Sequence, residues 1–219
     1  MTVGSTAADD WTTLSTATIS DALDRLRLPG SMLGIAPLFD RARVVGRAFT
    51  VRYIPAGSPP GTVGDYLDDV APGEVVVLDN AGRTDCTVWG DILTAMAHNR
   101  GITGTVINGV CRDVARALDI DYPIYSRGRF MRTGKDRVEM SNVGQPVNIG
   151  GVQVAAGQLV VGDADGVVAV PIDRESEVLN ICHRIHAREA DIVTDVLSGM
   201  SLGEARARHD YHTLQREAT

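Results

Sequence analysis

The sequence is poorest in lysine, aromatic residues and cysteine. It has a single lysine, Lys135, within a total of 21 lysines and arginines, and aromatic residues make up 5% of the chain. Its three cysteines, Cys86, Cys111 and Cys182, are widely spaced and form no CxxC pair. Such spacing favours reduced thiols over a disulfide framework or a zinc site. A catalytic cysteine is not expected either, because no feature near these residues supplies a base.

The chain also lacks a basic surplus and a long apolar run. Its 21 basic residues are outnumbered by 28 acidic residues, and the net charge of −7 gives no sign of a nucleic-acid-binding surface. No apolar run approaches the roughly 18 residues of a membrane span, and residues 1–10 lack the basic start and apolar stretch of a secretory signal. We therefore expect a cytoplasmic protein with neither a nucleic-acid partner nor a membrane partner.

The length and composition predict one domain. A chain of 219 residues with 44% hydrophobic residues can bury one sizeable core but is short for two independent ones. Residues 1–219 are therefore predicted to form a single domain, in which residues 174–208 form a helical C-terminal segment.

Hydrophobic periodicity predicts an α/β organisation in the first half of the chain. A helix, a strand, a second strand, a second helix and a third strand are expected over residues 14–26, 43–54, 74–79, 89–99 and 104–108. Ile92, Ala95 and Met96 give the second helix its periodicity. The succession of strand, helix and strand predicts a βαβ unit.

Residues beyond 122 predict short strands and then a long helix. Strands are expected over residues 123–126, 145–154, 158–161 and 167–170, the last two joined by a turn at residues 163–166. Residues 174–197 have helical periodicity, and Glu189 falls within the apolar stripe of Val178, Cys182, Ile185, Ile192 and Val196. A carboxylate in a buried stripe is costly unless it has a partner, so Glu189 requires one.

Two polar loops follow the central strands, where open α/β sheets usually bind ligands. The first leads to Gly90 and Asp91 at the start of a helix, which leaves the amides of Ile92 and Leu93 available for a carboxylate ligand. Substrate selectivity is expected to depend on two other loops, residues 55–64 and 126–138. The loop of residues 55–64 is rich in proline and glycine and is suited to lie over a pocket.

The second loop leads to the pair Arg112-Asp113. Arginine offers a rigid fork of donors for a carboxylate or enolate, and aspartate is a hard oxygen ligand for Mg²⁺ or Mn²⁺. A Schiff-base mechanism would use a lysine in place of such a divalent cation, and it requires a lysine with a lowered pKa. The one lysine, Lys135, lies in a polar segment that reads as exposed loop, which disfavours that mechanism.

Asp91, followed after twenty residues by Arg112-Asp113, resembles the signature of a known enzyme family. The family comprises the class II pyruvate aldolases that cleave 4-hydroxy-4-methyl-2-oxoglutarate and 4-carboxy-4-hydroxy-2-oxoadipate, together with the regulator of ribonuclease activity A. The resemblance extends to residues 16–23, 46–51 and 162–168 and covers roughly residues 12–200.

The resemblance implies a swivelling β/β/α domain with a compact β core flanked by helices, assembled as a homotrimer or a dimer of trimers. It implies that Asp113 binds Mg²⁺ or Mn²⁺ and that Arg112 holds the 2-oxo or enolate oxygen of a 2-oxo acid. The amides of Ile92 and Leu93 would hold the pyruvyl carboxylate, and Asp91 would position a metal-linked water. Glu189, in the C-terminal helical segment at a subunit interface, is the candidate for a glutamate that approaches the metal waters of a neighbouring subunit.

The implied activity is carbon–carbon cleavage of 4-hydroxy-2-oxo acids to pyruvate, with oxaloacetate decarboxylation as a side activity. The alternative is a non-catalytic regulator that binds and inhibits a ribonuclease, because the signature occurs in both branches of the family. One position departs from the family's wider pattern, since Arg116 stands where glutamate is common three residues after the aspartate. This departure leaves the particular substrate open.

Overall fold

The computed structural model describes residues 11–211, which divide into two compact units. One unit is Gly30–Ile172, and the other combines the segments that precede and follow it in the sequence. The predicted single domain over residues 1–219 stays a prediction. Each unit is described by itself below.

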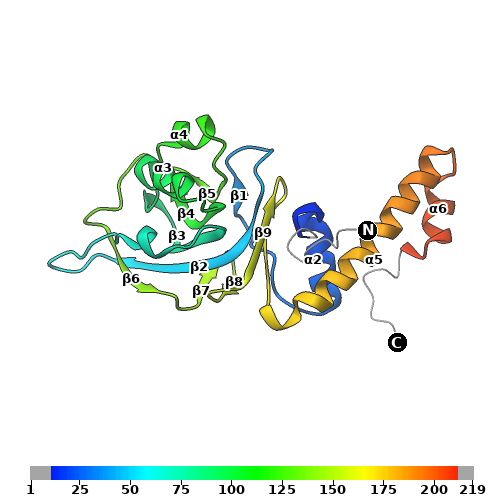
Figure 1. The fold of residues 1–219 in the computed structure, drawn as a ribbon, viewed down its shortest axis with the longest axis horizontal. Helices are drawn as coiled ribbons and strands as arrows, with labels where there is room; N and C mark the ends of the chain where they lie inside the picture. Colours follow the sequence, from blue (N-terminus) through cyan, green and yellow to red (C-terminus); the bar gives the residue numbers. More distant parts are fainter. Residues whose placement is uncertain (1–10, 212–219) are drawn as a thin grey trace, which may run out of the picture. The chain divides into compact units, whose positions relative to one another are not determined.

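An eight-stranded mixed sheet forms the larger unit, with the strand order β1-β5-β4-β3-β2-β9-β10 and β6 paired with β2 (Figure 1). The three pairings among β2, β3, β4 and β5 are parallel, and the others are antiparallel. The strands are β1 (Ala36–Pro37), β2 (Val44–Pro55), β3 (Glu74–Thr87), β4 (Gly104–Cys111), β5 (Ile124–Arg129), β6 (Val138–Val143), β9 (Leu159–Asp163) and β10 (Gly166–Val170). A separate hairpin contains β7 (Val147–Ile149) and β8 (Val152–Val154).

The segment of residues 30–37 connects the two edges of this sheet. Met32 N–H donates to the Val167 carbonyl of β10 at 3.0 Å, and Ala36 pairs with Ser126 of β5. The same stretch of chain therefore pairs with β10 at one end of the sheet and, as β1, forms the outer strand beside β5 at the other.

Helices α3 (Asp91–Asn99) and α4 (Val114–Asp119) and the short 3-10 helix η1 (Tyr66–Asp69) contribute to a hydrophobic cluster on one side of the sheet. Trp89 and Tyr122 stack at its centre with ring centroids 6.3 Å apart. A second cluster includes β2, β3, β4 and the β7–β8 hairpin. The predicted α/β fold with a β core flanked by helices and the predicted βαβ unit, here β3-α3-β4, are confirmed.

The buried face of α3 differs from the predicted one. Ile92, predicted to face the core, is 78% exposed, and Ala95 is also exposed, whereas Thr94 and Ala97 are buried. Burial of Thr94 is tolerated because its hydroxyl accepts a hydrogen bond from Trp89 Nε1 at 2.9 Å and lies 2.9 Å from the Gly90 carbonyl. The apolar periodicity alone did not show that a polar residue with local partners lies in the core.

A strand that the sequence did not predict, β6, pairs with the second half of β2. Only its first residue, Val138, falls within the loop expected over residues 126–138, and its side chains are mostly half-buried or exposed. Such a strand on the sheet periphery carries a weak apolar pattern because only part of it faces the core. Its position fixes the end of the preceding loop, which contains Lys135.

A buried carboxylate connects three strands of the larger unit. Asp79 of β3 is 7% exposed and accepts hydrogen bonds from Ala81 N at 2.9 Å, Asn108 Nδ2 at 3.0 Å and Asn148 N at 3.2 Å. Asn108 lies on β4 and Asn148 on β7, so one side chain holds the hairpin against the sheet.

The second unit contains α2 (Thr16–Arg25), α5 (Glu175–Leu197) and α6 (Leu202–Arg208). Ser15 caps α2 by accepting a hydrogen bond from Thr18 N at 3.1 Å. The apolar stripe of α5 is buried at Val178, Cys182, Ile185 and Ile192, as the periodicity predicts. Among residues 11–211, no helix combines the length and the apolar character that a membrane span requires.

Removing the Asp79 carboxylate is expected to destabilise the protein. Asp79→Ala leaves three polar hydrogens without their acceptor in a buried site, so the free energy of unfolding should fall by about 2–4 kcal/mol. Urea unfolding at neutral pH measures the change, with Asp69→Ala at an exposed position as the control. Equal stability of the two variants would contradict the proposed role of the Asp79 network.

Candidate active site

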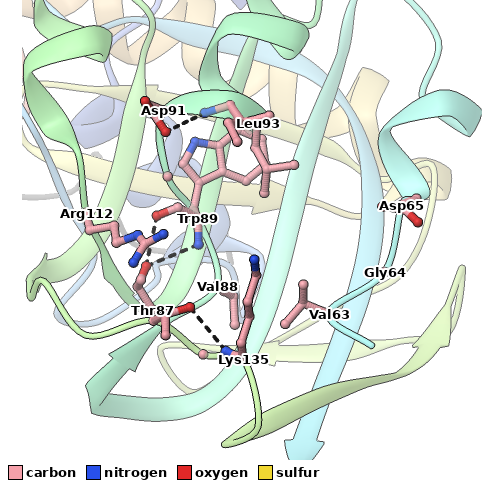
Figure 2. Close-up of a pocket in the computed structure, with 14 residues that line it drawn as sticks. Val63, Gly64, Asp65, Thr87, Val88, Trp89, Asp91, Leu93, Arg112 and Lys135 are labelled. Atoms are coloured by element: carbon pink, nitrogen blue, oxygen red, sulfur yellow. Dashed lines mark hydrogen bonds between the residues drawn. The ribbon is translucent and has the colours of Figure 1, made fainter. Parts of the chain in front are cut away.

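A cavity of about 210 Å³ opens where β3 and β4 lead into α3 and α4. Four segments of the larger unit line it: residues 63–65, residues 87–93, Arg112 and residues 133–135. Figure 2 shows these segments around the cavity, with Arg112 and Lys135 both among the labelled residues. The loop 55–64, predicted to lie over a pocket, contributes Val63 and Gly64 to its wall.

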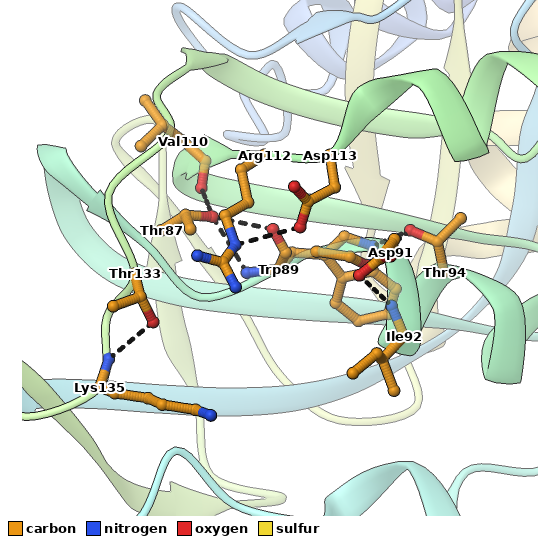
Figure 3. A network of polar contacts seen from close by, with 11 residues as sticks. Thr87, Trp89, Asp91, Ile92, Thr94, Val110, Arg112, Asp113, Thr133 and Lys135 are labelled. Carbon is orange, nitrogen blue, oxygen red and sulfur yellow. Dashed lines mark hydrogen bonds and ion pairs between the residues drawn. The ribbon is translucent and has the colours of Figure 1, made fainter.

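Thr87, the last residue of β3, connects the two turns of the site. Its hydroxyl lies 2.8 Å from the Val110 carbonyl and 2.9 Å from the Trp89 carbonyl, and it accepts a hydrogen bond from Trp89 N at 3.1 Å. The Trp89 carbonyl also accepts a hydrogen bond from Arg112 N at 3.0 Å. These contacts hold the turn after β3 against the turn after β4 (Figure 3).

Arg112 and Asp113 form an ion pair at the start of α4. Arg112 Nε lies 3.1 Å from Asp113 Oδ2, and the two side chains are 36% and 42% exposed. Asp113 has a φ of +56°, in the left-handed region, and its side chain makes no capping hydrogen bond to α4. The carboxylate is therefore directed to the arginine and remains accessible to a ligand.

Gly90 lies close to this ion pair. A Cβ atom at this position would lie 2.8 Å from Asp113 Oδ2 and 3.4 Å from Arg112 Nε. The first contact is shorter than real Cβ atoms accept, so only glycine fits without displacing the carboxylate. This distance places the start of α3 against the start of α4, and so brings Gly90 and Asp91 together with Arg112 and Asp113.

The amides at the start of α3 are only partly available. Asp91 Oδ1 accepts a hydrogen bond from Ile92 N at 2.8 Å, so the carboxylate of Asp91 occupies one of the two predicted ligand amides. The Leu93 amide lies in the first turn of the helix, where N–H groups lack an intrahelical acceptor. A carboxylate ligand that bound both amides would have to displace Asp91 from Ile92.

The donors around Asp113 suit a hard divalent cation that retains most of its water. Within the described residues, no group of three or more histidine, cysteine, aspartate or glutamate side chains surrounds a possible metal position. Mg²⁺ usually keeps several waters and is bound through one or two carboxylates together with the substrate. The accessible carboxylate of Asp113 fits this mode, and it does not fit a closed zinc cage.

Glu189 belongs to the other compact unit and is not among the residues that line the cavity. It is half-buried on α5, and burial raises the pKa of its carboxyl, with a further contribution from the negative charge of Asp21. His186 acts in the opposite direction. The shift agrees with the predicted placement of Glu189 in the buried stripe, and its approach to a neighbouring subunit stays a prediction.

Sequence reasoning did not place Lys135 in the cavity. Its side chain is exposed, as predicted for a polar loop, but that loop folds back so that Lys135 lines the cavity wall. The sequence did contain one signal for this position. Lys135 is the single lysine among the 21 lysines and arginines of the chain.

The three cysteines are free and buried, and burial raises the pKa of each thiol, that of Cys182 to about 12. A thiol with a raised pKa forms little thiolate at neutral pH and is a poor nucleophile. None of the three lines the cavity. This chemistry is consistent with the expectation that no cysteine is catalytic.

A family model described as RraA-like, Aldolase/RraA, matches residues 16–169. The chain is 38% identical over 200 residues to Protein DlpA of Legionella pneumophila, a match that covers 90% of this chain and 32% of that protein. The chain thus spans about a third of the length of that relative. It is also 38% identical over 169 residues to a Halalkalibacterium halodurans protein named "Putative 4-hydroxy-4-methyl-2-oxoglutarate aldolase", covering 76% of this chain and 77% of that protein.

Solved structures share the fold. An uncharacterised protein from Pseudomonas syringae superposes with a TM-score of 0.86 at 40% identity, over 94% of this chain and 99% of that one. The Streptomyces coelicolor protein RraAS2, described as an unusual member of the RNase ES inhibitor RraA family, gives a TM-score of 0.77 at 27% identity. That likeness covers 84% of this chain and 94% of RraAS2.

Replacing Glu189 with glutamine is expected to stabilise the isolated chain at neutral pH. Because the pKa of Glu189 is raised in the folded state, its ionisation opposes folding above that pKa. The urea midpoint of Glu189→Gln should exceed that of the wild type at pH 7, and the difference should shrink as the pH falls through the raised pKa. A difference that grows on acidification would show that the sign of the shift is wrong.

Proposed function

The chain belongs to the RraA-like family, and from this premise we propose that it is a divalent-metal-dependent lyase that cleaves 4-hydroxy-2-oxo acids to give pyruvate. 4-Hydroxy-4-methyl-2-oxoglutarate is the representative substrate. Oxaloacetate decarboxylation is the expected side activity, since both reactions pass through the enolate of pyruvate.

One observation carries this proposal: Arg112, which lines the cavity together with Gly90, is ion-paired with the accessible carboxylate of Asp113 just outside the lining. Carbon–carbon cleavage beside a 2-oxo group leaves an enolate, whose negative charge is stabilised by preorganised positive charge. The cation of Arg112 is in place before a substrate arrives, because its backbone N–H donates to the Trp89 carbonyl and its side chain is ion-paired with Asp113. The site is thus prepared for the charge that the reaction develops.

Each side chain has a distinct task in this proposal. Arg112 donates hydrogen bonds to the 2-oxo oxygen and to the same oxygen as it becomes an enolate. The amides of Ile92 and Leu93 at the start of α3 bind the carboxylate next to the 2-oxo group. Asp91, released from the Ile92 amide by that carboxylate, would position a water that takes the proton of the 4-hydroxyl as the C3–C4 bond breaks and returns a proton to the enolate carbon that becomes the methyl group of pyruvate.

Asp113 would hold the divalent cation, with water and substrate oxygens as the remaining ligands. The cation would supply Lewis-acid stabilisation of negative charge at the 2-oxo oxygen. Mg²⁺ and Mn²⁺ both fit an oxygen-only donor set.

We further propose assembly as a homotrimer or a dimer of trimers, with Glu189 of one copy near the cavity of another. The support is chemical: a half-buried carboxylate with a raised pKa needs a partner, and an adjacent site with a cation would supply one. Arg116, one turn after Asp113 and exposed on α4, adds positive charge near the site where the family pattern often has glutamate.

The second candidate is a non-catalytic regulator that binds and restrains a ribonuclease. The observation that favours it is the likeness to RraAS2, which is named as a member of a ribonuclease-inhibitor family. A regulator uses its surface rather than its cavity, so the two functions differ in whether the ion pair at the cavity is required.

Metal removal provides the first test. Pyruvate release from 4-hydroxy-4-methyl-2-oxoglutarate and from oxaloacetate should require Mg²⁺ or Mn²⁺, fall to background after EDTA treatment, and return when the metal is restored. A coupled dehydrogenase assay follows the pyruvate. Failure to release pyruvate from either acid with metal present would reject the lyase and favour the regulator.

Substitution of the ion pair provides the second test. Arg112→Ala and Asp113→Ala should each lower kcat/KM for pyruvate release by at least about a hundredfold. The first variant lacks the guanidinium that stabilises the enolate, and the second lacks the carboxylate that would hold the divalent cation. Asp119→Ala at the end of α4 serves as a control and should keep near-normal turnover. Thermal unfolding checks that all three variants fold, and normal turnover in Arg112→Ala would refute the assigned roles.

A further inference from the structure

We propose that Lys135 is the specificity-determining residue of the cavity and binds a second carboxylate, at the substrate end distant from the 2-oxo group. The inference rests on the proposed function, because it takes the 2-oxo end of the substrate to lie at Arg112. It assigns to this one side chain the preference for 2-oxo diacids over 2-oxo monoacids that lack the second carboxylate.

The cavity contains two cationic side chains on separate segments. Arg112 enters it from the turn after β4, whereas Lys135 enters it from the loop between β5 and β6. Figure 2 shows the lysine side chain extending between Val88 and Val63 into the cavity. A ligand in the cavity can therefore meet two cationic side chains that come from different segments.

The backbone of the Lys135 loop is held firmly against the site. Arg132 O accepts a hydrogen bond from Thr87 N at 3.0 Å, and Lys135 N donates to Thr133 Oγ1 at 3.2 Å. A Cβ atom on Gly134 would lie 2.5 Å from the Thr87 carbonyl, so this glycine allows the loop to pack directly on the end of β3. Thr87 is the residue that also fixes the Trp89 turn, which sets the position of Lys135 relative to Arg112.

The ammonium group of Lys135 is available to a ligand. Within residues 11–211, no hydrogen bond or ion pair involves Lys135 Nζ, and the carboxylate of Asp65, which lines the same cavity, forms no ion pair with it. The walls near the lysine stem are apolar at Val63 and Val88. An anion in this position would gain a charge-assisted hydrogen bond that the free protein lacks.

Lysine suits this position better than another arginine. Its compact ammonium on a flexible stem reaches a carboxylate at varying distance, whereas the guanidinium requires a fixed planar geometry. A site that hydrogen-bonds a polar group discriminates strongly against an analogue that lacks the group, since the donor is then left unpaired. The cavity thus combines a rigid donor for the invariant 2-oxo end with an adaptable donor for the variable end.

The test compares binding of a matched pair of 2-oxo acids in the presence of Mg²⁺. 2-Oxoglutarate carries the second carboxylate, and 2-oxobutanoate has hydrogen in its place. By calorimetry, the wild type should bind 2-oxoglutarate more tightly. Lys135→Met should weaken 2-oxoglutarate binding by about tenfold to a hundredfold and change 2-oxobutanoate binding by less than about threefold.

Two controls separate charge from loop damage. Lys135→Arg keeps the charge and should retain most of the preference for the diacid. Arg132→Met removes a long cationic side chain from the same loop, outside the residues that line the cavity, and should leave both affinities unchanged. Thermal unfolding of each variant reports whether it folds.

The proposal is overturned if Lys135→Met weakens both acids equally, if it weakens neither, or if the wild type shows no preference for the diacid. It is also overturned if borohydride reduction in the presence of pyruvate attaches the acid to Lys135, because the lysine would then be a Schiff-base nucleophile. A diacid preference that depends on Lys135, without pyruvate release in the metal-dependent assay, would retain the binding site and reject the lyase. Pyruvate release that is unaffected by substitution of Lys135 would retain the lyase and reject the role of Lys135 in binding the second carboxylate.

Discussion

The site depends on the close packing of the turn after β3 against the turn after β4. Because position 90 has no side chain, Asp113 Oδ2 and Arg112 Nε can take the space beside Gly90 that a Cβ atom would enter. The hydroxyl of Thr87 lies within hydrogen-bonding distance of the Trp89 carbonyl in the turn after β3 and of the Val110 carbonyl near the end of β4, and Arg112 N donates to the Trp89 carbonyl. The packing of these two turns is what places the amides of α3 and the cation of Arg112 at the same cavity.

The parallel pairing of β3 with β4 delivers both turns to the same edge of the sheet. Asp79 strengthens this arrangement from the other side, since it connects β3 with Asn108 of β4 and with Asn148 of the β7–β8 hairpin. One set of buried polar contacts therefore holds the strands in register, and a second set near the cavity holds the turns. Buried polar groups with complete partners specify one arrangement of a core rather than several.

Charge in the cavity is divided between fixed and adaptable groups. Arg112 is held by the carboxylate of Asp113, and Asp91 is held by the amide of Ile92, so the chemistry-bearing end of the cavity is preorganised. Lys135 stands on a firmly packed loop, and its ammonium group has no hydrogen-bond or ion-pair partner among residues 11–211.

Most of the fold could be predicted from the sequence, because periodicity records which face of an element is buried. The capped helix α2, the long helix α5, the βαβ unit and the turn at residues 163–166 were all predicted in this way. One exception is the single strand expected over residues 145–154, which is instead the β7–β8 hairpin. Two others have a common cause. β6 pairs at the sheet periphery with half-buried side chains, and Thr94 turns inward because Trp89 supplies a hydrogen bond, so neither leaves an apolar pattern.

For the site, the sequence by itself determined the residue types of Asp91, Arg112 and Asp113 and their spacing. It also placed each of them where a helix follows a strand and a turn. Only the tertiary structure decided that Gly90 touches the ion pair, that Asp91 occupies the Ile92 amide, and that the loop of Lys135 packs on Thr87. Contacts between segments far apart in the chain depend on how the sheet pairs and how its loops pack. Local periodicity carries no record of either.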